Sequence, residues 1–172
     1  MKLYICEICG DAYIGEEKPA DCPFCGAKNN FIKLGDEAKP IVAEKIEISE
    51  ISKKNLMETL ALETRANAIY LCMAGKAKEY KMQKMYKRLA KVELEHATIV
   101  TKLLGIPMPE IKEESCADEL VENFQKTIEL EDHAVELYKK FTEESVEDNI
   151  RKFFVALAQA EAGHIELIKN YL

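Results

Sequence analysis

The sequence predicts a mainly α-helical protein, in which a four-helix bundle follows a small N-terminal metal-knuckle domain. Two observations support this prediction. Two C-x-x-C pairs lie within the first 34 residues, and from about residue 53 onward apolar residues recur at the i, i+3, i+4, i+7 spacing of amphipathic helices. We expect a four-cysteine domain at residues 1–35, a linker at 36–50 and the bundle at 51–172.

Composition limits the possible functions. The 172 residues are 48% hydrophobic, which is enough for a core, and the net charge of −7 without a Lys/Arg block argues against nucleic-acid binding. No apolar run is long enough to cross a membrane, and the N-terminus does not resemble a signal peptide, so we expect a cytoplasmic protein. Cysteines in that reducing compartment remain thiols. Cys72 and Cys116 are interpreted as structural or incidental.

The N-terminal cysteines predict a metal site. Each C-x-x-C pair is followed by glycine, which permits the tight turn beneath a tetrahedral metal. Four thiolates bind either Zn(II), as a purely structural ion, or a single iron that carries one electron. The spacing is compatible with both metals, and iron is favoured because a redox-active site is predicted downstream. The four candidate ligands are Cys6, Cys9, Cys22 and Cys25.

The helical part divides into four segments. The first begins at Ser49 or Ser52, both suitable N-cap residues, and "GIPMP" ends the second because Gly105 can terminate a helix and proline cannot continue one. Modest connections predict an antiparallel bundle, with the longest link between the second and third helices. The expected helices span residues 53–80, 82–104, 117–144 and 147–171.

Each helix has an apolar stripe that is interrupted by acidic residues near its middle. The first and third helices each contribute one glutamate, and the second and fourth each contribute Glu-x-x-His. Thirty residues separate Glu63 from Glu93, and thirty also separate Glu131 from Glu161. The two halves of the bundle therefore place the same groups at the same spacing, as if one pair of helices were repeated. Uncompensated carboxylates in a core would cost several kcal/mol each, whereas two cations would neutralise them. The six candidate ligands are Glu63, Glu93, His96, Glu131, Glu161 and His164.

The ligand chemistry favours iron or manganese over zinc or copper, because the set is rich in oxygen and poor in nitrogen. A single E-x-x-H is usually a solvated pair on a helix surface, but two copies in register with two further glutamates indicate a metal site. His133 is turned about 200° from Glu131 and is interpreted as a surface residue. Tyr70 and Tyr138 lie two turns beyond Glu63 and Glu131, and either hydrogen bonding to these glutamates or packing explains them.

At this point the chain resembles a known family. "YICEICGDAYIGEEKPADCPFCGA" is similar to the rubredoxin-type domain of rubrerythrins, and the helical part resembles their ferritin-like domain. The order, with the small domain first, resembles the variants called reverse rubrerythrins. The resemblance implies two irons at the carboxylate site and a rubredoxin-type iron at the four cysteines. It also implies that the catalytic residues are Glu63, Glu93, Glu131, Glu161, Tyr70 and Tyr138.

The function implied is that of a non-haem di-iron peroxidase. It would reduce hydrogen peroxide to water, in defence against oxidative stress, with electrons from a reductase passing through the Fe(Cys)4 centre. Family members form homodimers in which the small domain of one subunit serves the bundle of the other. Leu62, Ile69 and Met73 widen the apolar arc of the first helix, which a homodimer or a broad core would bury.

One position departs from the family pattern. Rubrerythrins carry a further glutamate three residues after the third-helix ligand, where this chain has Ala134. Two alternatives therefore remain open for the same bundle: a dioxygen-reducing oxidase, or a ferroxidase or iron-binding protein. The non-enzymatic alternative is a zinc-knuckle interaction module attached to a metal-binding bundle.

Overall fold

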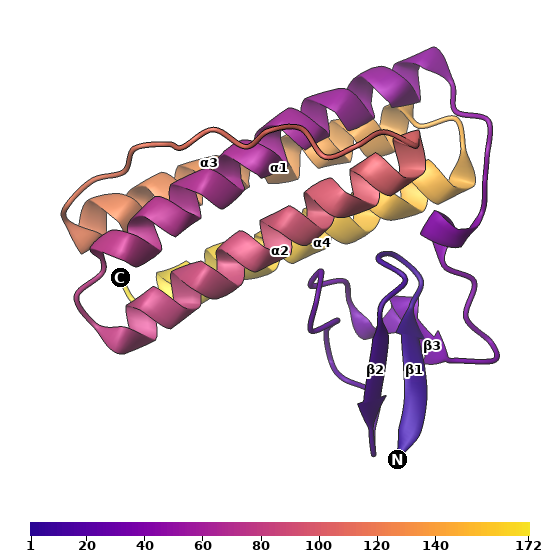
Figure 1. Cartoon of the computed structure of the whole chain (residues 1–172), viewed down its shortest axis with the longest axis horizontal. Helices are drawn as coiled ribbons and strands as arrows, with labels where there is room; N and C mark the ends of the chain where they lie inside the picture. Colours follow the sequence, from indigo (N-terminus) through magenta and orange to yellow (C-terminus); the bar gives the residue numbers. More distant parts are fainter.

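The computed structural model describes residues 1–172 as a small antiparallel sheet followed by four long helices, in agreement with the predicted fold class (Figure 1). Strands β1 (Lys2–Cys6), β2 (Ala12–Gly15) and β3 (Ile32–Leu34) are arranged in the order β2-β1-β3. The pairing places Tyr4 opposite Tyr13 and Cys6 opposite Ile32. The 3-10 turn η1 (Asn29–Phe31) directly precedes β3, and a second one, η2 (Ile41–Ala43), lies within the segment 36–50 that was expected as a linker.

The helices are α1 (Glu50–Lys76), α2 (Tyr80–Leu104), α3 (Leu120–Glu144) and α4 (Asp148–Lys169). Ser49 caps α1 through a hydrogen bond from the Ser52 amide, and Gly105 ends α2 with φ 66°, as predicted. The prediction placed the end of α1 four residues too late, because Ala77 already has extended backbone angles. It placed the start of α3 three residues too early, because the Asn123 side chain bonds both backbone groups of Ala117 ahead of the helix.

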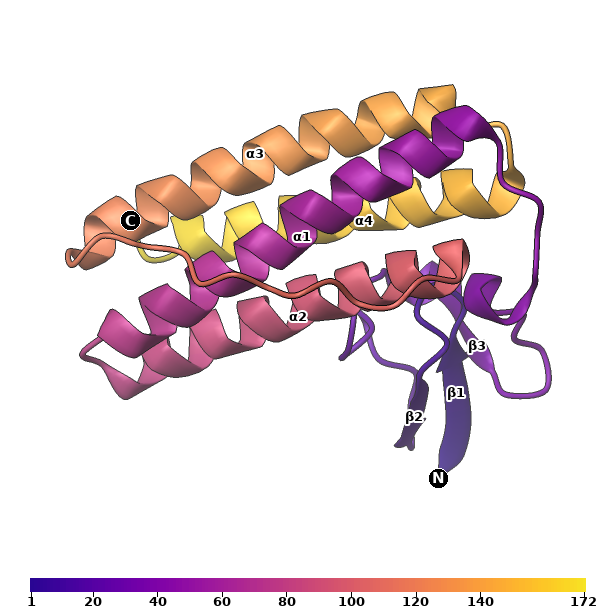
Figure 2. The same ribbon diagram turned by 45° about the horizontal axis from the view of Figure 1, so that its top comes forward.

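The connection between α2 and α3 is the longest one in the bundle, as predicted. Residues 105–119 run in extended form along the outside of α1 (Figure 2). A disulfide between Cys72 and Cys116 and an ion pair between Arg65 and Glu114, at 3.2 Å, hold this segment to α1. The expectation that all cysteines remain thiols is therefore wrong for Cys72 and Cys116. Their disulfide is structural, which is one of the two interpretations that the sequence suggested for them.

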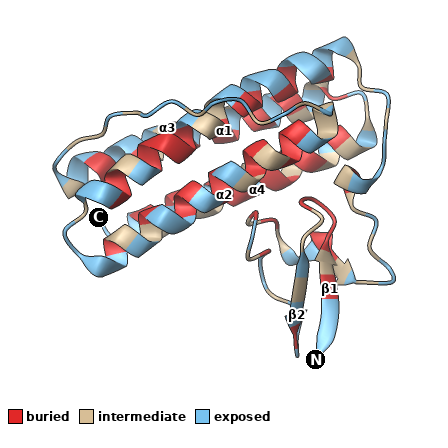
Figure 3. Ribbon diagram, viewed as in Figure 1, coloured by how far each residue is buried: buried red, intermediate tan, exposed pale blue.

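The buried residues lie where the helices face one another and where the small sheet meets the bundle (Figure 3). Ile69 and Met73 are buried within the chain and Leu62 is half-buried, and the sulfur of Met73 lies 3.7 Å from the Thr127 hydroxyl oxygen of α3. The wide apolar arc of α1 therefore belongs to a broad core and does not require a second subunit. No helix combines the length and apolar character needed to cross a bilayer.

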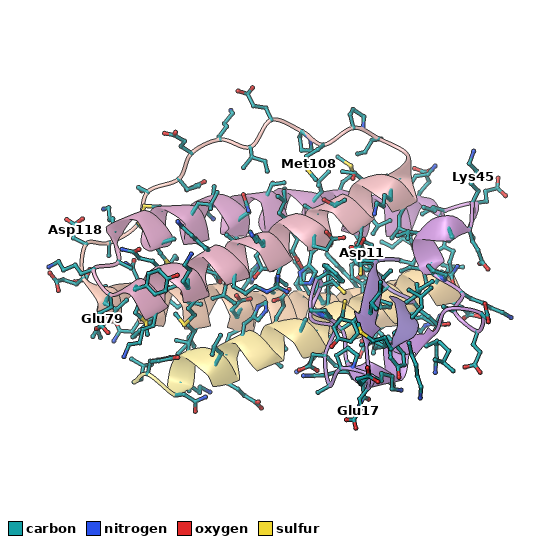
Figure 4. All side chains as sticks on the ribbon, turned by 60° about the horizontal axis from the view of Figure 1, so that its bottom comes forward. Asp11, Glu17, Lys45, Glu79, Met108 and Asp118 are labelled. Carbon is teal, nitrogen blue, oxygen red and sulfur yellow. A yellow bond between two sulfur atoms is a disulfide. The ribbon has the colours of Figure 1, made fainter.

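The small sheet packs against α2 and α4 through its two knuckle turns (Figure 4). Gly26 lies so close to α4 that a Cβ atom there would be 3.3 Å from the Cβ of Ala160, and its φ of 75° also favours glycine. Beside this contact, Lys152 lies 3.8 Å from the carboxylate of Glu7. The fit between the two parts consequently depends on small residues at their closest point.

Candidate metal centres

The four N-terminal cysteines meet in one buried cluster at the ends of the knuckle turns. The Sγ atoms of Cys6 and Cys25 are 3.7 Å apart, as are those of Cys9 and Cys22. Thiolates bound at 2.3 Å around a tetrahedral ion stand about 3.8 Å apart, whereas a disulfide requires about 2.0 Å. The spacing thus fits a four-coordinate metal, as the sequence predicted.

The backbone of both knuckles supports this geometry. The amide of Gly10 donates to the Cys6 carbonyl at 2.9 Å, and the amide of Gly26 donates to the Cys22 carbonyl at 3.0 Å. Both glycines have positive φ, 82° and 75°, a conformation that side-chain-bearing residues rarely adopt. The two turns are therefore near copies of each other, and each presents its cysteines toward the same point.

The structure also brings all six predicted bundle ligands together at mid-helix. Their ligand atoms form two groups, in each of which all atoms lie within 4.8 Å of one another. Glu93 and Glu161 belong to both groups, so their carboxylates lie between two potential ion positions. Each group is completed by one histidine and one further glutamate: Glu63 with His96 in the first, and Glu131 with His164 in the second.

The two shared carboxylates and the inward nitrogens of both histidines have no hydrogen-bond partner. Both carboxylate oxygens of Glu93 and of Glu161, and Nδ1 of both histidines, are buried without a hydrogen bond. His96 Nδ1 lies 3.1 Å from oxygens of both Glu93 and Glu161, and His164 Nδ1 lies 2.8 Å from Glu161. Buried charges are normally paired or bound to metals. The donor set therefore fits two cations.

The electrostatics without metal support the same interpretation. Burial raises the pKa of Glu63 to about 8, although His96 opposes the shift, and burial also raises the pKa of Glu131 well above its ordinary value. Burial would raise the pKa of Glu161 as well, but the charges of His96 and His164 more than reverse that effect and lower it. The cluster must bind protons where it lacks cations.

The two tyrosines hydrogen-bond to carboxylates of the site, but in a crossed arrangement. The Tyr70 hydroxyl donates to Glu131, and the Tyr138 hydroxyl donates to Glu63. The expected pairing with the glutamate of the same helix is wrong, because seven residues span about 10.5 Å of helix axis. The facing helix supplies the glutamate at the correct height instead. Burial raises the pKa of both hydroxyls well above their ordinary value.

A contact that the sequence did not predict joins the two centres. Nε2 of His96 lies 2.8 Å from the carbonyl oxygen of Cys25. Because Nδ1 faces the carboxylates, Nε2 carries the proton and donates it to this carbonyl. The small domain in this structure contacts the bundle of its own chain, whereas the resemblance implied that it serves a second subunit. No spacing motif in the sequence indicates this contact.

A cavity of about 290 Å³ lies between α1 and α3 and reaches the carboxylates. Ala134, where the family pattern has a glutamate, is buried in its wall and offers no ligand atom. His133 is exposed, as predicted, and does not contribute to either group of ligands. The exposed lining residues include Glu58, Arg65 and His133. A small molecule can thus reach the site without passing the sulfur cluster.

Comparison with known proteins gives consistent matches over both parts. The rubrerythrin profile matches residues 54–172, and the profile of the rubrerythrin rubredoxin-like domain matches residues 4–32. Reverse rubrerythrin-1 of Clostridium acetobutylicum is 30% identical over 188 aligned positions, covering 100% of this chain and 97% of that protein. In this chain the small domain comes first, as the two matched ranges show.

Two solved structures are similar to this chain. A hypothetical protein from Pyrococcus furiosus is 25% identical with a TM-score of 0.55, over 70% of this chain and 87% of its own. The manganese catalase KatB from Anabaena is 15% identical with a TM-score of 0.59, over 75% of each chain, which shows a shared fold alone. The predicted ferritin-like bundle with a rubredoxin-like knuckle is confirmed.

Proposed function

The chain belongs to the rubrerythrin family, and from that premise we propose that it is a di-iron peroxidase. It reduces hydrogen peroxide to two water molecules, taking up two electrons and two protons. Family membership itself points to an oxidoreductase. The observation that carries the finer assignment is the hydrogen bond from His96 to the Cys25 carbonyl, which connects the site that would bind peroxide to a site that would supply electrons.

The six bundle residues would hold two irons. Glu93 and Glu161 would lie between the ions, with Glu63 and His96 on one and Glu131 and His164 on the other. Iron bound there would supply two electrons for cleavage of the peroxide O–O bond. The protein leaves both carboxylate oxygens of Glu93 and of Glu161 free of hydrogen bonds, so that these oxygens remain available.

The chain also places proton donors at the site. The hydroxyls of Tyr70 and Tyr138 are buried next to Glu131 and Glu63, and both keep their protons because burial and the adjacent carboxylates raise their pKa. Each carboxylate would deliver a proton to the leaving oxygen and take one up from its tyrosine, which would be reprotonated from solvent through the cavity. The cavity between α1 and α3 would admit peroxide to the same place.

Electrons would arrive one at a time through the four-cysteine centre, which takes the role of an Fe(Cys)4 carrier. Cys25 is the ligand whose peptide carbonyl accepts from His96, so the route between the centres crosses one hydrogen bond within the chain. A reductase would load the sulfur centre from outside, and a homodimer is proposed as the assembly. Iron in the sulfur centre predicts a red ferric protein, whereas zinc would leave it colourless.

The test is to compare oxidants. Protein loaded with iron and reduced anaerobically is mixed in a stopped-flow instrument with hydrogen peroxide or with dioxygen, while the visible absorption of the sulfur centre is followed. Faster re-oxidation by peroxide is expected. The variant Cys22→Ser, which would lack the sulfur-bound iron, provides the baseline. The peroxidase assignment is falsified if dioxygen re-oxidises the protein much faster.

A dioxygen-reducing oxidase or a ferroxidase is the second candidate, and Ala134 is the observation that favours it. This residue leaves the site with six protein ligands and with no carboxylate at the position where the family pattern has a seventh. The same mixing experiment decides between peroxide and dioxygen. A ferroxidase that stores iron would also need a cage, so a particle the size of a dimer in size-exclusion chromatography would count against storage.

A further inference from the structure

A series of aromatic rings leads from the carboxylate site toward the C-terminus. Tyr70, which donates to Glu131, has its ring centroid 6.0 Å from that of Tyr86. Tyr86 stacks with Phe124 at 6.4 Å, and Phe124 stacks with Tyr171 at 6.1 Å. The first three rings are buried, and Tyr171 is 43% exposed. The C-terminus lies at the end of the bundle remote from the small sheet (Figure 1).

The second half of the bundle provides an internal comparison. Tyr138 is 68 positions after Tyr70, the same offset that separates the equivalent ligands, and the residue 68 positions after Tyr86 is Phe154. The Tyr138 ring lies 5.9 Å from Phe154, which in turn lies 5.3 Å from Phe153. Both phenylalanines are fully buried. In this half, therefore, the rings beyond the tyrosine cannot be oxidised and do not reach the surface.

The hydroxyl of Tyr86 is not needed for packing, because phenylalanine fills the equivalent position. It is fully buried, and its one hydrogen-bond partner is the Thr127 hydroxyl at 3.4 Å, a long contact. Thr127 donates to the Asn123 carbonyl, so Tyr86 is the donor in this contact. Burying a hydroxyl with so weak a partner costs free energy. A phenol, unlike a phenyl ring, can give up one electron together with its proton.

We infer that Tyr70, Tyr86 and Tyr171 form a second one-electron route, which carries oxidising equivalents from the carboxylate site to the surface when the sulfur centre has no electron to give. The inference rests on the proposed function, since peroxide provides the oxidising equivalents. One electron moves inward from Tyr171 to Tyr86, crossing the Phe124 ring by tunnelling without oxidising it, and then through Tyr70 to the oxidised site. The two inner tyrosines are oxidised and re-reduced in turn, and Tyr171 releases its proton to solvent as it becomes a neutral radical.

The hydrogen bonds of the inner tyrosines serve this transfer. Tyr70 can give its proton to Glu131 and recover it when it is re-reduced. As Tyr86 is oxidised, its proton shifts onto the Thr127 oxygen while Thr127 shifts its own proton onto the Asn123 carbonyl, and both protons return when Tyr86 is re-reduced. At the surface, a phenolic or other one-electron reductant would restore Tyr171, and in its absence two Tyr171 radicals from different molecules would couple to dityrosine. The route is separate from the sulfur centre, which contacts α2 and α4 through the knuckle turns.

The experiment exposes iron-loaded protein to excess hydrogen peroxide without any reductant. Electron paramagnetic resonance of rapidly frozen samples detects tyrosyl radicals, and dityrosine fluorescence with peptide mass spectrometry locates the coupled residue. Tyr86→Phe interrupts the route with the residue that the other half of the bundle uses, and Tyr171→Phe removes its end. Tyr80→Phe is the matched control, because Tyr80 is 72% exposed but is not part of the ring series. Circular dichroism and iron content show whether each variant folds and loads.

We expect the wild type and Tyr80→Phe to form a radical and a crosslink at residue 171. We expect the crosslink to fall to the level of metal-free protein in Tyr86→Phe and Tyr171→Phe, in which any tyrosyl radical stays on the inner tyrosines. Equal crosslinking in a folded, loaded Tyr86→Phe protein overturns the inference, as does crosslinking at Tyr80 as often as at Tyr171. Peroxide consumption without a Tyr171 radical overturns this inference alone. A wild type that consumes no peroxide overturns the proposed function together with it.

Discussion

The imidazole of His96 contacts both candidate metal centres: Nε2 lies 2.8 Å from the carbonyl oxygen of Cys25, and Nδ1 lies 3.1 Å from oxygens of Glu93 and Glu161. A hydrogen bond on the outer nitrogen fixes the tautomer and the orientation of a ligating histidine. Here the acceptor of that bond is the backbone carbonyl of Cys25, a residue of the sulfur cluster. Docking of the small domain and the geometry of the carboxylate site are therefore coupled.

Ala160→Val is predicted to slow electron transfer between the centres without removing a ligand. The added methyl groups would collide with Gly26, whose backbone packs against Ala160, and overpacking of this kind costs about 1–3 kcal/mol. The knuckle should then spend more time away from His96. The rate at which the sulfur centre is oxidised after mixing with peroxide, followed by its visible absorption, should fall about fivefold or more.

The control for this prediction is Ala162→Val, an identical substitution at an exposed position on the same helix. It should leave the rate unchanged, and metal analysis should show full loading of both variants. Equal rates in the two variants would show that the distance from Cys25 to His96 does not limit transfer.

The sequence predicted the ligands because the helical period places them. Glu63, Glu93, Glu131 and Glu161 interrupt apolar stripes at equivalent heights, and a regular helix leaves no choice about which way they point. The hydrogen bonds from Tyr70 to Glu131 and from Tyr138 to Glu63 could not be predicted in this way. The helical rise already keeps Tyr70 away from Glu63 of its own helix, but which neighbouring glutamate it meets depends on how antiparallel helices are offset, and packing decides that offset.

The sequence did not predict how the small domain packs against the bundle, or which cysteines form a disulfide. The contact from Cys25 to His96 depends on how Gly26 fits against α4, which is a property of two surfaces and not of a periodic pattern. Cys72 and Cys116 are 44 residues apart without a spacing motif, and their pairing follows from the path of residues 105–119 along α1. The hydrophobic arc of α1 was ambiguous for the same reason, because helix packing decides contacts such as that between Met73 and Thr127 of α3.

The stability of the metal-free protein is predicted to fall as the pH rises from about 5 to about 8. Folded, metal-free protein holds a proton on Glu63, whose pKa is about 8 against an ordinary 4.5, and stability from this proton is lost as the pH approaches 8. His96 and His164, whose pKa values are also raised, act in the same direction. Each such proton changes the free energy of unfolding by about 1.4 kcal/mol per pH unit. The lowered pKa of Glu161 affects only more acidic solutions.

Thermal unfolding in chelator, followed by circular dichroism across this pH range, measures the slope. Protein loaded with Fe(II) or Mn(II) should show a higher melting temperature and a weaker pH dependence, because cations replace the protons. Glu63→Gln should flatten the metal-free curve. A melting temperature of metal-free protein that rises with pH would contradict the assignment of these protons.

Removing the disulfide is predicted to destabilise the protein by about 2–4 kcal/mol. The bond between Cys72 and Cys116 closes a loop of 44 residues, and its loss restores conformational freedom to the unfolded chain. Urea unfolding of Cys116→Ser, compared with the wild type with and without a reductant, measures the change. The reductant should lower the midpoint of the wild type and leave that of the variant unchanged. An unaltered midpoint in the variant would mean that the bond does not contribute.

Two glycine substitutions are predicted to have opposite effects on stability. Gly105 ends α2 with φ 66°, so Gly105→Ala should destabilise the protein by about 1 kcal/mol through backbone strain. Gly75 lies within α1 with an ordinary helical backbone, and Gly75→Ala should stabilise it by about 0.5–1 kcal/mol. At both positions an added Cβ has no neighbour within 4 Å, so packing does not distinguish them. Urea midpoints of the two variants should therefore move in opposite directions, and a shift of the same sign in both would show that backbone conformation is not the cause.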